Sequence, residues 1–139
     1  MTSPLVVLAI DLGSRSGWAT PTASGAVDFR GSDYEIALDR HAALFDRFSL
    51  WLSDMIDQHQ PAVVVLEKNP ALGRLIRNAA PTLLGLRAIA AVVAYRREIL
   101  LDELPSAGRR SPDKSDENDA KALLARWMAT RAHLVREAA

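Results

Sequence analysis

The sequence contains no cysteine, which excludes disulfide bridges and metal sites built from thiolates. It also lacks any run that approaches the roughly 18 uninterrupted apolar residues of a membrane-spanning helix. No basic region followed by an apolar stretch and a cleavage site precedes the first apolar run, so no secretory leader is predicted. Together these absences predict a cytoplasmic protein without a membrane partner.

The chain also lacks a net charge, since 17 Lys and Arg residues balance 17 Asp and Glu residues. A neutral balance argues against a nucleic-acid partner, but the charges are unevenly distributed along the chain. Residues 1–67 hold 4 basic and 9 acidic side chains, whereas residues 68–114 hold 9 basic and 4 acidic ones. A basic middle segment beside a group of acids is compatible with a polyanion bound across a metal site. Arginines scattered on solvated helix faces would explain the same distribution equally well.

A chain of 139 residues, 49% of them apolar, is long enough for one compact domain and too short for two. We therefore expect residues 1–139 to form a single domain. Its first apolar run ends on Asp11 and predicts a strand buried on both faces of a sheet. Gly13 and Gly17 bracket a polar turn after that strand. The next predicted strands cover residues 17–20 and 26–30.

Apolar residues then recur at helical spacing over residues 38–60. A second apolar run, residues 62–67, predicts another buried strand, and this one ends on Glu67. The remaining predicted elements are a helix over residues 82–97, a strand over residues 98–104 and a helix that begins near Ser115.

This order of elements predicts an α/β protein with one mixed five-stranded sheet flanked by helices. The first three strands are expected to form an antiparallel meander, because short turns join them. The fourth and fifth strands follow crossover helices, so they are expected to run parallel to the first. The helix over residues 82–97 is apolar nearly all round, which predicts a place in the core or against a second subunit.

Four carboxylates are predicted to converge in this fold. If the strands that end on Asp11 and Glu67 pair in parallel, the two acids lie side by side and repel unless a cation lies between them. Asp116 and Asp119 are three residues apart, so they face the same way on the last helix, along its core-facing stripe. Oxygen ligands without nearby Cys or His favour Mg²⁺ or Mn²⁺. Two such ions can clamp the attacking and leaving oxygens of a phosphodiester displacement.

Each acid also has an explanation that involves no metal. Acids in the first turn of a helix interact favourably with the helix dipole, which would account for Asp116 and Asp119. An Asp-x-Gly sequence at a strand end is common in turns, and a lone glutamate after a strand is weaker evidence still. The joint occurrence of all four acids, in this order and on these elements, favours the metal site.

Three segments resemble the RuvC-type Holliday junction resolvases of the RNase H-like superfamily. They are Ile10-Asp11-Leu-Gly13 followed by Gly17-Trp-Ala, then Val-Val-Leu-Glu67-Lys-Asn, and Asp116-Glu-Asn-Asp119-Ala120. The resemblance spans essentially the whole chain and implies an RNase H-like fold. It also implies that Asp11, Glu67, Asp116 and Asp119 are catalytic metal ligands for Mg²⁺ or Mn²⁺. The implied activity is cleavage of branched DNA in recombination or repair, by a homodimer that makes two cuts across one junction.

The chain departs from this family between its last strand and last helix. Family members usually carry a longer basic stretch there, with a lysine near the active site. Arg109, Arg110 and Lys114 are the candidates to replace that lysine, and together with Arg74 and Arg77 they are the predicted contacts to DNA phosphates. The aromatic side chain that some relatives carry after the fourth strand is absent. The short form is more similar to a phage- or prophage-type member.

Two other functions stay open at this point. The YqgF-type family, thought to trim ribosomal RNA precursors, is similar in length and shares the Asp-x-Gly turn, but it generally lacks a glutamate like Glu67. A catalytically silent nucleic-acid-binding or assembly module of the same fold is the second alternative, although the complete set of acids argues against it. No small-molecule cofactor is predicted, and the apolar helix over residues 82–97 is the predicted dimer interface.

Overall fold

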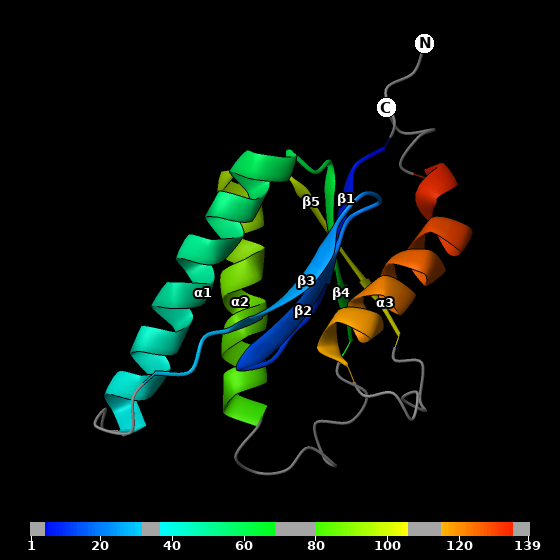
Figure 1. Cartoon of the computed structure of the whole chain (residues 1–139). Helices are drawn as coiled ribbons and strands as arrows, with labels where there is room; N and C mark the ends of the chain where they lie inside the picture. Colours follow the sequence, from blue (N-terminus) through cyan, green and yellow to red (C-terminus); the bar gives the residue numbers. More distant parts are fainter. Residues whose placement is uncertain (1–4, 32–36, 69–79, 106–114, 135–139) are drawn as a thin grey trace.

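The computed structural model describes residues 5–31, 37–68, 80–105 and 115–134 (Figure 1). These residues form five strands and three helices in the order that the sequence predicts. The strands are β1 (Val7–Asp11), β2 (Arg15–Ala19), β3 (Ser24–Asp28), β4 (Val63–Glu67) and β5 (Leu100–Leu104). The helices are α1 (Ala37–His59), α2 (Ala80–Arg96) and α3 (Asp116–Thr130).

The strands form one mixed sheet with the order β3-β2-β1-β4-β5. The pairs β1–β2 and β2–β3 are antiparallel, whereas β1–β4 and β4–β5 are parallel. The predicted antiparallel meander with two parallel strands is therefore confirmed. Its parallel half brings the carboxyl ends of β1, β4 and β5 to one edge of the sheet.

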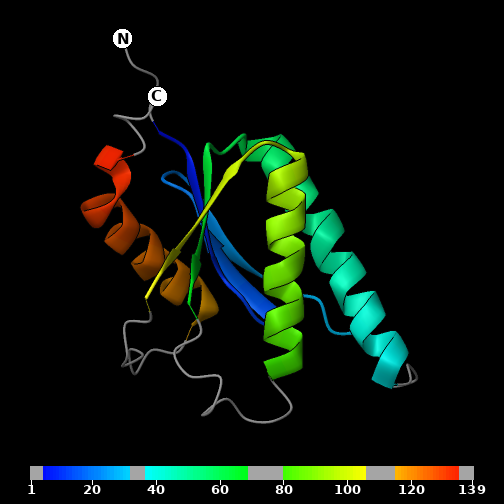
Figure 2. The same cartoon turned by 180° about the vertical axis from the view of Figure 1, so that it is seen from behind.

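Helices cover both faces of the sheet. Helices α1 and α2 pack side by side on one face, and α3 lies across the other, as the two opposite views show (Figures 1 and 2). On β1, Leu8 and Ile10 belong to the core under α1 and α2. Val7 and Ala9 belong to the second core, which includes Trp127 of α3. The alternation follows from the two-residue period of a strand, so both faces of β1 are buried.

This alternation decides which face the strand-ending acids occupy. On β4, Val63 and Val65 pack in the core beneath α3, which places Glu67 on that same face. On β1, Ala9 packs in the same core, so Asp11, two residues later, also lies on the face that α3 covers. The parallel register pairs the residues that precede the two acids, so both carboxylates project from neighbouring strand ends toward α3.

The strand limits differ from the prediction by about two residues in β2 and β3. Gly17 was predicted as the first residue of this strand, but it lies in the middle of β2, because the turn closes earlier than expected. The hydroxyl of Ser16 is buried; it donates a hydrogen bond to the Gly13 carbonyl and accepts one from the Gly13 N–H. On the other side of the sheet, β5 begins two residues later than predicted, after Glu98 adopts a left-handed φ of 56°.

None of the helices in the four described ranges is long and apolar enough to cross a membrane.

Candidate metal centre

The end of β1 is held in place by its sheet partners. Asp11 pairs with Gly17 in the antiparallel ladder, and the Ser16–Gly13 hydrogen bonds fix the turn between them. A further backbone hydrogen bond, from the N–H of Phe29 to the carbonyl oxygen of Ser14, ties the turn to the end of β3. The Asp11 backbone is thus fixed by its ladder partner, Gly17, and by the hydrogen-bonded turn that joins the two strands.

Helix α3 begins directly over this turn. A β-carbon at position 17 would lie 1.7 Å from the carbonyl oxygen of Asp116, so only glycine lets the first turn of α3 come this close to the sheet. Ser115 caps the helix by accepting a hydrogen bond from the Asn118 N–H. The sequence therefore fixes both where α3 begins and how closely it approaches Asp11.

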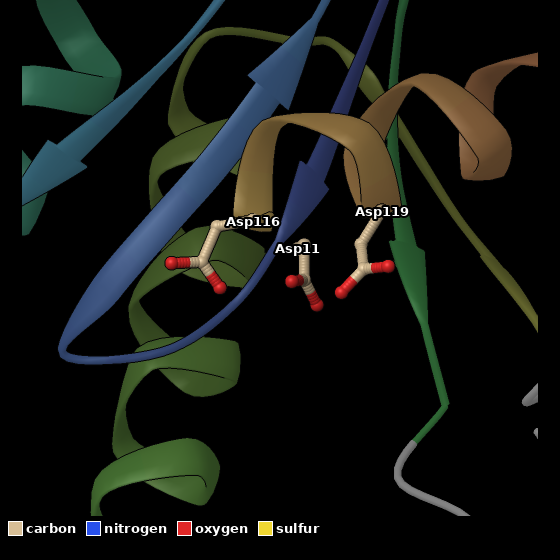
Figure 3. Close-up of side chains that lie close together, drawn as sticks. All are labelled: Asp11, Asp116 and Asp119. Carbon is tan, nitrogen blue, oxygen red and sulfur yellow. The ribbon is translucent and has the colours of Figure 1, made fainter. Parts of the chain in front are cut away.

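Three carboxylates converge at this contact. Asp11, Asp116 and Asp119 each offer an oxygen atom that lies within 4.8 Å of those of the other two. In the close-up the three side chains enter one space, Asp11 from the end of β1 and the other two from the first turn of α3 (Figure 3). All three are partly exposed, so a ligand can reach them from solvent.

The residues present suit a hard divalent cation. Three carboxylates from two elements provide only oxygen donors, the kind that Mg²⁺ and Mn²⁺ prefer. Each carboxylate is partly desolvated and close to two like charges, which a cation among them would offset. The first turn of α3 offsets part of this repulsion, since the helix N-terminus is electropositive. Both the metal-binding and the helix-dipole explanations therefore apply to the acids of α3.

Glu67, the fourth predicted ligand, lies on the same face but is not part of the three-carboxylate group. Its Oε2 atom is 3.2 Å from Nη1 of Arg126 on α3. The same guanidinium donates a hydrogen bond to the carbonyl oxygen of Pro105, just after β5. Glu67 thus lies at the predicted edge of the sheet with an arginine as its partner.

Two further ion pairs and one hydrogen bond involve the first turn of α3. Arg15 Nε lies 3.5 Å from Asp116 Oδ2, and both side chains are partly exposed. Ser24 of β3 donates a 2.6 Å hydrogen bond to Glu117, and this bond lowers the pKa of the Glu117 carboxyl below its ordinary value. Lys121, one turn further along α3, lowers the pKa of Glu117 in the same direction.

Two arginines near the carboxylates have no counterpart in the sequence-based prediction. Arg15 and Arg126 each pair with one predicted ligand. Arg126 follows Asp119 by seven residues, which is a detectable helical spacing, but nothing in the sequence indicates that Glu67 is its partner. The predicted DNA contacts lie outside the described residues; they are Arg74, Arg77, Arg109, Arg110 and Lys114.

The chain matches no protein-family model and no curated protein in sequence. It is similar in fold to RuvC of Thermus thermophilus in complex with a Holliday junction substrate, with a TM-score of 0.69 and 14% identity over 92% of this chain and 97% of that one. A second Thermus thermophilus RuvC structure gives a TM-score of 0.66 and 14% identity, covering 90% and 96%. The yeast mitochondrial Holliday junction resolvase gives 0.52 and 15%, covering 74% and 53%.

These comparisons confirm the fold that the family resemblance implied. The sheet order, its mixed strand directions and the helices on its two faces correspond to the RNase H-like fold of RuvC. The likeness covers nearly the full length of both chains in the Thermus thermophilus structures. At 14% identity the likeness is one of architecture.

Proposed function

We propose that this protein is a divalent-cation-dependent endonuclease that cuts branched DNA. The observation that carries the proposal is the convergence of Asp11, Asp116 and Asp119 at the edge of the sheet. These side chains come from two elements far apart in sequence, and glycine at position 17 permits their approach. Support for the substrate comes from the fold neighbour that was solved with a Holliday junction.

In this proposal the three aspartates bind Mg²⁺ or Mn²⁺, and Glu67 serves as a fourth ligand from the neighbouring strand end. Ions held by these carboxylates would supply an activated water and would neutralise charge on the departing 3′ oxygen. The chain's own contribution is rigidity, because β1 and the start of α3 fix the carboxylates before substrate arrives. The partial exposure of the group leaves room for a phosphodiester to reach it.

The basic residues Arg74, Arg77, Arg109, Arg110 and Lys114 stay the predicted phosphate contacts in this proposal. They belong to segments that precede α2 and α3, next in sequence to Glu67 and Asp116. Phosphate contacts position a nucleic acid without reading its sequence. The proposed specificity therefore rests on the shape of a branched substrate, bound by two copies of the chain.

The proposal is tested by incubating the protein with a synthetic four-way junction, linear duplex, single-stranded DNA and RNA, each with Mg²⁺, Mn²⁺ or EDTA. We expect paired symmetric nicks on the junction that disappear with EDTA and with Asp119→Asn. The Asp119→Asn variant is expected to retain most of its junction binding, because the charge it removes repels phosphate. Metal-dependent cutting of RNA alone would favour a YqgF-like activity. No cutting of any substrate by wild type would favour a silent binding module.

A further inference from the structure

Arg126 holds the one predicted ligand that lies outside the three-aspartate group. Its guanidinium reaches Glu67 through Nη1 and the Pro105 carbonyl oxygen through Nη2. Arg126 follows Asp119 by seven residues, which is two turns along nearly the same face of α3. The guanidinium therefore lies where β4 and β5 end, and β1, the neighbour of β4 in the sheet, ends on Asp11.

The backbone of Glu67 is fixed, so only its side chain can change partner. Glu67 pairs with Leu104 in the parallel ladder, and the next N–H, from Lys68, donates a 2.7 Å hydrogen bond to the Leu104 carbonyl. Asp11, on the adjacent strand, lies one residue beyond the last register pair that joins β1 and β4. The Glu67 carboxylate thus has Arg126 as its present partner and, on the adjacent strand end, Asp11 as the acid it would join at a shared cation.

This ion pair is easy to exchange. The side chains of Arg126 and Glu67 are 33% and 30% exposed, so water screens the interaction. Partly exposed ion pairs of this kind contribute little net free energy, because attraction is offset by desolvation and lost side-chain entropy. A divalent cation beside three aspartates offers the Glu67 carboxylate a more highly charged partner.

We propose that Arg126 is the counter-ion of Glu67 when no cation is bound, and that a divalent cation competes with Arg126 for this carboxylate. The inference rests on the proposed function, because the cation is what gives Glu67 its second partner. The exchange moves no proton and breaks no covalent bond. It releases a guanidinium at the ends of β4 and β5, where the planar donor fork of arginine suits a phosphate oxygen. Arg126 is thus a positioning residue that acts through Glu67.

The experiment measures Mn²⁺ binding by calorimetry without DNA, for wild type, Arg126→Met, Glu67→Gln and the double variant. We expect Arg126→Met to tighten Mn²⁺ binding about two- to fivefold, the range that corresponds to a partly exposed ion pair. In the Glu67→Gln background the same change is expected to have a much smaller effect. Lys121→Met is the matched control, since it removes one positive charge from the same helix but from a different partner, Glu117.

The inference is overturned if Arg126→Met leaves Mn²⁺ affinity unchanged or weakens it. It is also overturned if the gain is as large with Glu67→Gln or with Lys121→Met, since the effect would then be general electrostatics. Arg126→Gln is measured as a second replacement, and thermal unfolding confirms that both variants are folded. If wild type binds no Mn²⁺, the proposed metal centre fails together with this inference. If wild type binds Mn²⁺, Asp119→Asn abolishes it and Arg126→Met resembles wild type, only the inference fails.

Discussion

Gly17 and Asp116 are in direct backbone contact, and this contact sets the position of α3. A β-carbon at Gly17 would meet the Asp116 carbonyl oxygen at 1.7 Å and the Glu117 nitrogen at 2.7 Å. Gly17 also pairs with Asp11 in the β1–β2 ladder. Because glycine has no side chain, the acids of α3 can lie close to the acid that ends β1.

Replacing Gly17 by Ala is expected to push the first turn of α3 away from the sheet. Overpacking of this kind typically costs about 1–3 kcal/mol of unfolding free energy, measurable by urea denaturation. It is also expected to weaken Mn²⁺ binding, measurable by calorimetry, because Asp116 and Asp119 move with the helix. Gly85→Ala is the comparison, since Gly85 packs against the Phe45 ring on the opposite face of the sheet. Equal Mn²⁺ affinities of the Gly17→Ala variant and wild type would show that the contact at Gly17 does not position the acids of α3.

A second prediction concerns Asp102 of β5, which anchors α3 away from the metal centre. Its carboxylate accepts a 2.9 Å hydrogen bond from the buried Trp127 indole and lies 3.1 Å from the Arg131 guanidinium. Asp102→Ala leaves the indole N–H without this acceptor, at an expected cost of about 1–3 kcal/mol in unfolding free energy. Asp102→Asn keeps an acceptor oxygen and is expected to lose less. Equal urea midpoints for Asp102→Ala and Asp102→Asn would show that the hydrogen bond is unimportant.

The Ser24–Glu117 hydrogen bond predicts a pH dependence of stability. It lowers the pKa of Glu117 below its ordinary value of 4.5, and Lys121 adds to the same shift. A lowered folded-state pKa contributes stability that is present above the unfolded-state pKa and lost as the pH falls through the folded-state value. Ser24→Ala is therefore expected to reduce stability at neutral pH and to approach wild type in acid.

Urea denaturation at a series of pH values measures this difference. Glu117→Gln serves as the control, because it removes the titrating carboxyl while keeping a side chain of similar shape. A Ser24→Ala effect that stays constant from neutral to acid pH would mean that the hydrogen bond does not depend on the Glu117 charge.

The exposed face of α2 predicts self-association. Leu84, Val92 and Tyr95 follow one stripe of this helix, and they are 47%, 47% and 84% exposed. A C2 dimer would let this stripe pack against its own copy. Val92→Glu is expected to convert a dimer to a monomer in sedimentation velocity, because it buries a charge at the interface. Leu50→Glu on α1, an exposed apolar position outside the stripe, is the control. A monomeric wild type at all concentrations tested would contradict the dimer.

Much of the fold could be predicted from two patterns in the sequence. Apolar runs that end on Asp11 and Glu67 indicated buried strands, and the helical segments between strands indicated parallel pairing. The position of Gly17 could not be predicted, since glycine is typical both of turns and of close helix contacts. The structure shows that Ser16 closes the turn before Gly17, which shifts β2 toward the N-terminus. The apolar pattern therefore predicted the elements, while a local hydrogen bond set their limits.

The site was predictable only in part. Helical spacing placed Asp116 and Asp119 on one face, and the structure brings Asp11 to them. The partner of Glu67 was not predictable, because Arg126 lies 59 residues away in sequence and meets it only through the packing of α3. Ion pairs between distant elements leave no spacing in the sequence that would reveal them.

The most direct test of the metal centre is a crystal structure of the protein soaked in Mn²⁺, with anomalous diffraction recorded to locate the ion. We expect an anomalous peak coordinated by Asp11, Asp116 and Asp119, and its loss in the Asp119→Asn variant. If protein that binds Mn²⁺ in solution gives a crystal with no anomalous peak between the three carboxylates, these residues do not form the metal centre.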